Sequence, residues 1–286
     1  MKAIIHVYVA LIGFRTEKDP AKADSLAREF ITLLELEQYS IPETILEEIE
    51  IHLRNHWTAR YQNTRQEGYL LLQHQLQQRQ MERLRHNKKG TPARQLTNTL
   101  FTALKLGKVE WAAEILAGLG PRIMDIQAEL IHPILITHLL FEQKNYDQAA
   151  AALPHFFSYG QLTDTLFYAI AAKLDIRIRY ETNCLLDEEH FSMFRATQIK
   201  LKRDKSLTPD RRAQRERFFP LAMKLYRAKD YLRQSPQADV AKRLQDVWAA
   251  LADKSQPVVD TDWLEDKWLE LRRPDGPRPV FKTGNR

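Results

Sequence analysis

Residues 106–116, LGKVEWAAEIL, decide the fold class of this chain. The stretch places Gly107 between two helix-forming segments, an apolar residue two positions later, and Ala112 and Ala113 just beyond. Glycine readily adopts the left-handed backbone of a tight turn after a helix. A small alanine then lets the second helix approach the first closely. The pattern predicts two antiparallel helices joined by a short turn.

The same pattern returns 37 residues further along the chain. Residues 103–116, ALKLGKVEWAAEIL, align with residues 140–153, LFEQKNYDQAAAAL, so that paired alanines and a closing leucine coincide. We expect Gly107 and Asn145 to supply the positive φ angle of each turn. A third, weaker copy lies near residues 180–191, with Asn183 in its turn. A period in the high thirties with helix–turn–helix units is typical of an α-solenoid.

The composition agrees with a helical protein. The 286 residues include only 9 Gly and 13 Pro, with 44% apolar and 28% charged residues, which is ordinary for a globular chain. We therefore predict an all-α fold, an α-solenoid or tetratricopeptide-like array of about a dozen helices in antiparallel pairs. The predicted organisation is a single helical-repeat domain over 1–271, with irregular helices over 1–90, a repeat-like core over 91–205, C-terminal helices over 206–271 and an extended or disordered tail over 272–286.

Local signals place several of these helices. Ser40 and Pro42 predict a helix start, followed by an apolar face of Ile45, Leu46, Ile49, Leu53 and Trp57. Residues 59–87 predict one long helix whose end is solvated. Further helix starts are expected at Thr208, at Ser235 and at Asp260, and Pro220 is expected to kink its helix.

The first 14 residues, MKAIIHVYVALIGF, predict a buried first helix. They are interrupted by His6 and Tyr8, carry no small-residue cleavage site, and are too short to span a bilayer. The single cysteine, Cys184, excludes an internal disulfide and is expected to occupy a core or turn position. We expect the protein in the cytoplasm.

Five segments together resemble a known group of proteins: TALKLGKVEWAAEIL, FEQKNYDQAAAALPHF, AAKLDIRIRYET, FFPLAMKLYRAK and DWLEDKWLEL. Over roughly residues 20–271 the chain resembles the C-terminal portion of large helical-repeat proteins common in Bacteroidota, which are loosely similar to tetratricopeptide proteins. The chain departs from the tetratricopeptide consensus in its longer period and its missing aromatic and proline marks. The resemblance implies a scaffold or interaction role and transfers no catalytic residues.

Charge is unevenly distributed along the chain, whose formal net charge is +6. Residues 79–94 and 200–217 each carry a net charge of +5, whereas residues 29–50 hold seven glutamates and no Lys or Arg. Basic clusters of this kind bind phosphate backbones or acidic protein surfaces. The candidate contact residues are Arg79, Arg83, Arg85, Lys88, Lys89, Arg94, Lys200, Lys202, Arg203, Lys205, Arg211, Arg212 and Arg215, with Arg211, Arg212 and Arg215 expected to share one helix face.

Patterns for catalysis are weak. His52 and His56 are four residues apart, but Leu53 stands where a zinc protease needs glutamate. The acids of 187–189 beside His190 fit a helix start, and no phosphate-binding glycine loop or nucleophile motif occurs. We expect no enzyme, no cofactor, no metal and no membrane contact. The expected function is a protein–protein interaction scaffold or adaptor of a bacterial assembly. The alternatives are a nucleic-acid-associated accessory subunit, for example of a defence or mobile-element system, and self-association through the acidic segment.

Overall fold

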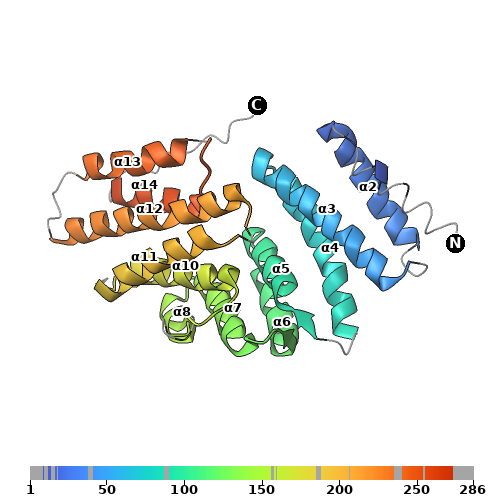
Figure 1. The fold of residues 1–286 in the computed structure, drawn as a ribbon, viewed down its shortest axis with the longest axis horizontal. Coiled ribbons are helices and arrows are strands. Elements are labelled where there is room, and N and C mark those ends of the chain that lie inside the picture. Colours follow the sequence, from blue (N-terminus) through green and yellow to red (C-terminus); the bar gives the residue numbers. More distant parts are fainter. Residues whose placement is uncertain are drawn as a thin grey trace. The chain divides into compact units, whose positions relative to one another are not determined.

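The described part of the chain is almost entirely helical (Figure 1), with twelve α-helices and one pair of two-residue strands, which confirms the all-α class. The computed structural model describes residues 9, 12–13, 17, 19–37, 41–86, 90–155, 158, 160–184, 188–205, 207–234, 240–253 and 255–272. The elements are α2 (Pro20–Glu37), α3 (Glu43–Thr64), α4 (Glu67–His86), β1 (Thr91–Pro92), α5 (Ala93–Lys105), α6 (Val109–Leu119), the short 3-10 helix η2 (Gly120–Arg122), β2 (Ile123–Met124), α7 (Ala128–Glu142), α8 (Tyr146–Ala152), α10 (Thr165–Glu181), α11 (Glu188–Arg203), α12 (Pro209–Gln234), α13 (Ala241–Ala252) and α14 (Thr261–Arg272).

The chain divides into two compact units, residues 1–124 and residues 125–286. The first unit contains α2 to α6 with the strand pair, and the second contains α7 to α14. The single domain expected over 1–271 stays a prediction. No helix in the described ranges combines the length and the apolar character that a membrane crossing requires.

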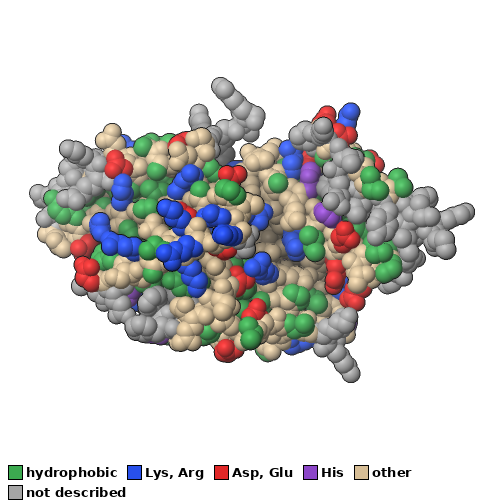
Figure 2. Space-filling view, in the orientation of Figure 1, with side chains coloured by type: hydrophobic (Ala, Val, Ile, Leu, Met, Phe, Trp, Pro, Cys, Tyr) green, Lys and Arg blue, Asp and Glu red, His purple; other side chains and the backbone are tan. Residues whose placement is uncertain are grey.

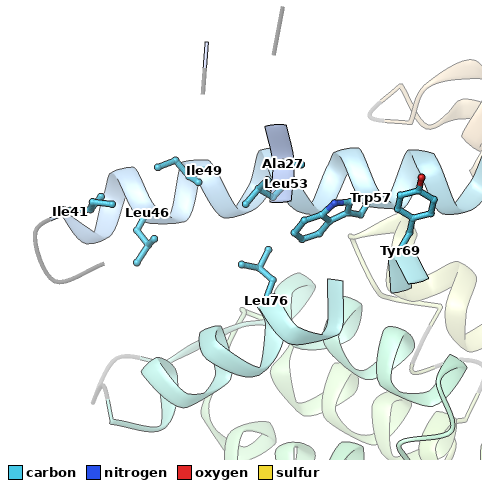
Figure 3. Close-up of a cluster of buried hydrophobic side chains, with 8 residues drawn as sticks. All are labelled: Ala27, Ile41, Leu46, Ile49, Leu53, Trp57, Tyr69 and Leu76. Atoms are coloured by element: carbon cyan, nitrogen blue, oxygen red, sulfur yellow. The ribbon is translucent and has the colours of Figure 1, made fainter. Parts of the chain in front are cut away.

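In the first unit, α3 packs on α4, α4 on α5 and α5 on α6. The buried face of α3 lies against α4, where Leu53 and Trp57 point toward Leu76 (Figure 3). This confirms the apolar face that helical spacing predicts, because Leu46 and Ile49 are buried on the same side. The strands β1 and β2 pair in parallel and bring the segment before α5 beside the end of η2.

In the second unit, α10 is the central helix and packs against α7, α8, α11 and α12. The last helices close around α12, which contacts both α13 and α14. The indole of Trp248 stacks on that of Trp268 with ring centroids 4.5 Å apart, and the Trp268 Nε1 donates to the Leu244 carbonyl at 3.1 Å. Helix α12 runs from Pro209 to Gln234 through Pro220, whose ring is exposed.

Three helix ends share one turn conformation. The helices α5, α7 and α10 each end in a residue with positive φ, namely Gly107 at 66°, Lys144 at 62° and Asn183 at 56°. At each end the residue after the turn donates its N–H to a carbonyl five positions earlier, which defines a Schellman motif. The three bonds are Lys108 N to Ala103 O at 2.9 Å, Asn145 N to Leu140 O at 2.9 Å and Cys184 N to Arg179 O at 3.0 Å.

The expected position of the second turn residue is wrong by one. Lys144, not Asn145, has the positive φ angle, whereas Asn145 precedes α8 with φ −85° and ψ 63°. Lys108 precedes α6 with nearly the same angles, φ −85° and ψ 55°. The 37-residue offset therefore holds at both turn positions, and the Schellman hydrogen bonds impose the left-handed conformation on a lysine.

Other local predictions need correction. The long helix over 59–87 is two helices, because Arg65 adopts φ 57° and ends α3. Its predicted solvated end is observed, since Glu82, Arg85 and His86 are exposed beyond the buried Met81. Val9 and Ile12 are 64% and 59% exposed, so a buried first helix is not observed at these positions. For Cys184, the turn position of the two that were expected is confirmed, and the residue is exposed.

Some predictions fall on other parts of the chain. The predicted helix start at Ser40 is wrong by two residues, because the N-cap of α3 is Pro42 and the helix begins at Glu43. The helix start at Ser235 and the tail over 273–286 lie outside the described residues. The helix starts at Thr208 and Asp260 are confirmed, since α12 begins at Pro209 and α14 at Thr261.

Candidate interaction surface

Exposed cations gather where α11 ends and α12 begins. Lys202 and Arg203 close α11, Lys205 lies in the turn, and Arg211 is in the first turn of α12, all of them exposed. None of the four makes an ion pair with another residue that the structure describes. Figure 2 shows Lys and Arg side chains gathered over α11 and α12. We call these four residues, together with Arg195 of α11, the α11–α12 cationic surface.

Arg195 extends this surface along α11 and was not among the predicted contacts. Arg195, Ile199 and Arg203 are spaced four residues apart, so they lie on one face of the helix. All three are exposed, and Ile199 retains 47% of its accessible area. The four-residue spacing was the signal that sequence reasoning could have used.

The turn that presents these cations is built from the neighbouring basic residues. The Thr208 hydroxyl accepts from the Arg211 N–H at 3.4 Å and helps to start α12. The Arg212 guanidinium donates to the carbonyls of Lys202 at 3.3 Å and Leu207 at 3.2 Å, so it satisfies the end of α11. Arg211, Arg212 and Arg215 therefore do not form one free face, because only Arg211 is fully exposed.

Lys200 also has a structural role. Its ammonium donates to the Leu162 carbonyl at 2.7 Å and lies 4.1 Å from the centroid of the Tyr168 ring. Burial lowers the pKa of this lysine. Lys200 therefore ties α11 to the segment that precedes α10.

A shallow hollow of about 450 Å³ lies beside the α11–α12 cationic surface. Ala196 and Ile199 give it an apolar lining, and Lys200 and Arg203 give it positive charge. Thr165 and Asp204 complete the lining. An aliphatic side chain flanked by carboxylates matches this combination of apolar and cationic groups.

The first predicted basic segment has a different environment. Arg83 contacts both oxygens of the buried Glu50 at 2.6 Å, and Gln80 donates to the same carboxylate at 2.9 Å. Burial raises the pKa of Glu50 more than Arg83 and Gln80 lower it. Arg85 pairs with Glu114 at 2.7 Å. Arg83 and Arg85 are thus neutralised within the first unit.

The remaining described members of that segment are Arg79 and Arg94. Arg79 is half-buried and lines a hollow of about 480 Å³ between α4 and α6, together with Trp111. Arg94 is exposed in the first turn of α5. Lys88 and Lys89 lie outside the described residues.

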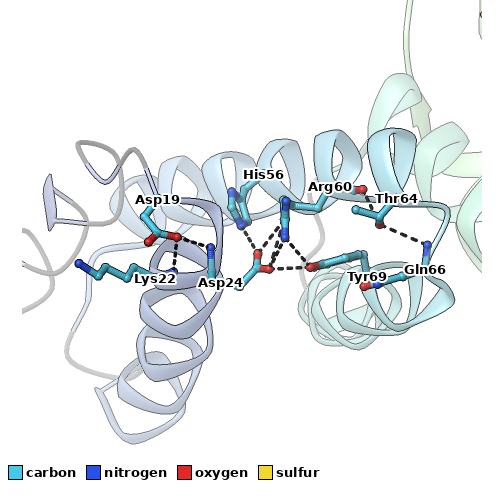
Figure 4. A network of polar contacts seen from close by, with 9 residues as sticks. Asp19, Lys22, Asp24, His56, Arg60, Thr64, Gln66 and Tyr69 are labelled. Carbon is cyan, nitrogen blue, oxygen red and sulfur yellow. Dashed lines mark hydrogen bonds and ion pairs between the residues drawn. The ribbon is translucent and has the colours of Figure 1, made fainter. Parts of the chain in front are cut away.

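The two histidines of α3 are not brought together as metal ligands. His56 Nε2 lies 2.8 Å from the Asp24 carboxylate, which also accepts from Arg60 at 2.9 Å and from the Tyr69 hydroxyl at 2.5 Å (Figure 4). Burial alone would raise the Asp24 pKa, but the hydrogen bonds from Arg60, Tyr69 and His56 outweigh it and lower the pKa. Within the described ranges, no three His, Cys, Asp or Glu residues are close enough to hold a metal ion.

A buried cluster in the second unit pairs its charges internally. Lys173 donates to the Asp260 carboxylate at 2.6 Å, and Arg177 pairs with Glu142 at 3.1 Å. Burial raises the Asp260 pKa, but the charges of Lys173 and Arg177 and the hydrogen bond from Lys173 outweigh it, so the pKa is well below its usual range. The Arg177 guanidinium lies 4.1 Å from the Phe141 ring centroid. These contacts join α7, α10 and the start of α14.

Neither the protein-family models nor the curated proteins nor the solved structures include a match to this chain. The resemblance to helical-repeat proteins of Bacteroidota stays a prediction. The functional conclusion therefore rests on the geometry of the surface.

Proposed function

We propose that this chain is a non-enzymatic scaffold or adaptor module that binds an acidic protein surface through the α11–α12 cationic surface. One observation carries the proposal: the cations of this surface are exposed and lack ion-pair partners among the described residues, whereas most buried charges are paired. Unpaired surface charge of one sign speeds and orients association with a surface of the opposite sign.

The proposal includes an α-solenoid, tetratricopeptide-like arrangement of the helix pairs. The three identical Schellman turns support it, because repeated helix–turn–helix units are what such an array requires. We assign the module to a bacterial assembly in the cytoplasm. A solenoid suits this role because each unit packs on its neighbours and leaves a long surface for a partner.

The apolar lining beside the cations favours a protein partner over a nucleic acid. Ala196 and Ile199 offer an aliphatic contact, which a partner side chain can fill. A phosphate backbone has no apolar group to place there, and single-stranded bases are usually bound by exposed aromatic rings. The ring of Tyr168 is buried beneath Lys200, and that of Phe191, one turn before Arg195, is partly buried with the Arg227 guanidinium 5.1 Å from its centroid. Nucleic-acid binding is the alternative that the exposed Lys and Arg side chains support.

The test is affinity purification from cells that contain a tagged copy beside the untagged chain, followed by mass spectrometry. The wild type is compared with an Arg203→Glu/Arg211→Glu double variant. The matched control, Lys22→Glu/Lys144→Glu, makes the same change in net charge at two exposed lysines elsewhere.

We expect an acidic protein, or the untagged chain itself, to be recovered with the wild type and the control. Recovery should fall by about tenfold or more with the Arg203→Glu/Arg211→Glu variant, because reversed charge repels the partner. Nuclease treatment should leave the recovery unchanged. Recovery of the tagged chain alone, or equal recovery with the reversed variant, would refute the proposal. Release by nuclease would replace it with the nucleic-acid alternative.

A further inference from the structure

The outer face of α3 carries an acidic stripe. Glu43, Glu47 and Ile51 are four residues apart and all exposed, and Glu48 lies beside Glu47. Ile51 retains 44% of its accessible area although it is a large aliphatic residue. The inner face of the same helix is the buried face that packs on α4 (Figure 3). We call Glu43, Glu47, Glu48 and Ile51 the α3 acidic stripe.

Two carboxylates of this stripe, those of Glu47 and Glu48, have little internal compensation. Glu47 makes no ion pair with another described residue, and among the described residues Glu48 pairs with His52, with the atoms 3.8 Å apart. The buried acid of α3, Glu50, lies on the inner side of the helix and is bound by Arg83. Glu47 and Glu48 are therefore available to a partner outside the first unit.

The face of α11 has the same four-residue spacing with the opposite charge. Arg195, Ile199 and Arg203 are all exposed, with the isoleucine between two arginines, whereas on α3 Ile51 follows Glu43 and Glu47. Eight residues of helix extend about 12 Å, so both stripes have the same length. When Ile51 is placed against Ile199, Glu47 lies one helical turn from the apolar contact on α3. Arg195 and Arg203 lie one turn away on either side of it on α11, so Glu47 meets an arginine whichever way the helices run.

We propose that the α11–α12 cationic surface binds the α3 acidic stripe of a second copy of this chain. The inference rests on the proposed function of the cationic surface and names its partner. Opposite charge, equal spacing and an isoleucine on both stripes argue for this occupant. Because the two surfaces differ, the contact is heterologous: each copy keeps one surface of each kind, and association continues into an open chain or a closed ring.

Sedimentation of the purified full-length protein tests this directly. The monomer mass is 33.5 kDa. At low ionic strength, about 50 mM salt, the average mass should rise above this value with protein concentration. At about 500 mM salt the average mass should return to that of the monomer, because screening weakens contacts between exposed charges. The Lys22→Glu/Lys144→Glu control should associate like the wild type.

Charge reversal gives the sharper test. The acid-reversed variant is Glu47→Lys/Glu48→Lys, and the base-reversed variant is Arg195→Glu/Arg203→Glu. Each variant alone presents two surfaces of like charge and should remain monomeric, with association weakened by about tenfold or more. An equimolar mixture should associate again, because each surface of one variant meets a surface of opposite charge on the other. Circular dichroism of each variant confirms that its helices are intact.

The outcomes separate this inference from the proposed function. A wild type that stays monomeric at every concentration overturns self-association, and so does a mixture that fails to recover association. The wild type could be monomeric and still recover a different acidic protein in the affinity purification. If the Arg203→Glu/Arg211→Glu variant then fails to recover that protein, the proposed function stands without this inference. Tighter binding of a mixed-sequence oligonucleotide than of a second copy, at the same low salt, would overturn both.

Discussion

The three Schellman turns predict opposite effects of glycine and non-glycine substitutions on stability. The perturbations are Gly107→Ala, Lys144→Gly and Asn183→Gly, each made alone. All three positions have the same left-handed backbone, with φ between 56° and 66°. A side chain with a Cβ atom costs roughly 1–2 kcal/mol in this conformation. Glycine, in turn, gives the unfolded chain extra entropy, which costs the folded state about 0.4–1 kcal/mol.

These two terms set the size and sign of each effect. A Cβ atom at Gly107 would have no heavy atom within 4 Å, so Gly107→Ala introduces backbone strain without a clash. We expect it to lower the free energy of unfolding by about 1 kcal/mol, after the entropy gain offsets part of the strain. Lys144→Gly removes the same strain and should raise the free energy of unfolding by about 1 kcal/mol. Asn183→Gly should change little, because asparagine tolerates the left-handed region.

The assay is urea unfolding followed by circular dichroism, fitted with a shared m-value. Gly107 and Lys144 belong to different units, so two transitions are fitted where the curve requires them. Lys144→Ala is the control, because it removes the lysine side chain and keeps the Cβ atom; its stability should match the wild type. A destabilised Lys144→Gly variant, or a stabilised Gly107→Ala variant, would refute the reasoning that the two turns are equivalent.

Three further predictions concern packing and titration. Ala112 is fully buried where α6 meets α5, so Ala112→Leu should lower the free energy of unfolding by about 1–3 kcal/mol in the same assay. The exposed Ala117→Leu should change it by less than about 0.5 kcal/mol, and equal effects would contradict the packing role. The charges of Lys173 and Arg177 outweigh burial and lower the pKa of Asp260 in the folded state. The ionised carboxylate therefore stabilises the fold at pH values above about 3.9, the pKa of aspartate in the unfolded chain. This stabilisation is lost as the pH falls from that value through the lower pKa of the folded state. The difference in unfolding free energy between wild type and Asp260→Asn should therefore shrink on acidification from about pH 6 to about pH 3, and a constant difference would argue against it. Burial lowers the pKa of His138 to about 3, so its ring should show no NMR titration between about pH 5 and pH 8; a midpoint near its ordinary value would contradict the burial.

Much of the fold could be predicted because its signals are local. Helical spacing identifies the buried face of α3, and Gly107 identifies its turn, since each depends on residues within two or three turns of helix. The turn at Lys144 could not be assigned from residue type, because lysine has no preference for positive φ. Its conformation is imposed by hydrogen bonds to carbonyls of α7. The break at Arg65 escaped prediction for the same reason.

The candidate surface was predicted only in part, because net charge over a sequence window ignores partners elsewhere in the chain. Arg83 lies 33 residues from Glu50, and Arg85 lies 29 residues from Glu114. Neither pairing leaves a trace in the local sequence. Arg195 was missed for the opposite reason: it lies just outside the basic window, although its helical spacing from Arg203 places it on the same face.

The contrast between the two basic segments also bears on assembly. Both have the same net charge in sequence, yet Arg83 and Arg85 of the first meet acids of their own unit, whereas Lys202, Arg203, Lys205 and Arg211 of the second make no ion pair with a described residue. The acid that neutralises Arg83 is Glu50 of α3, the last glutamate of the acidic segment 29–50, and it lies on the inner face of that helix. Beyond these internal pairs, Glu47 and Glu48 are exposed on the outer face of α3, and Lys202, Arg203, Lys205 and Arg211 are exposed where α11 ends and α12 begins. Exposed ion pairs add little to folding stability, so neither set of charges is there to hold its own unit together. In the proposed self-association the two sets meet between copies, and ionic strength then controls how far the association extends.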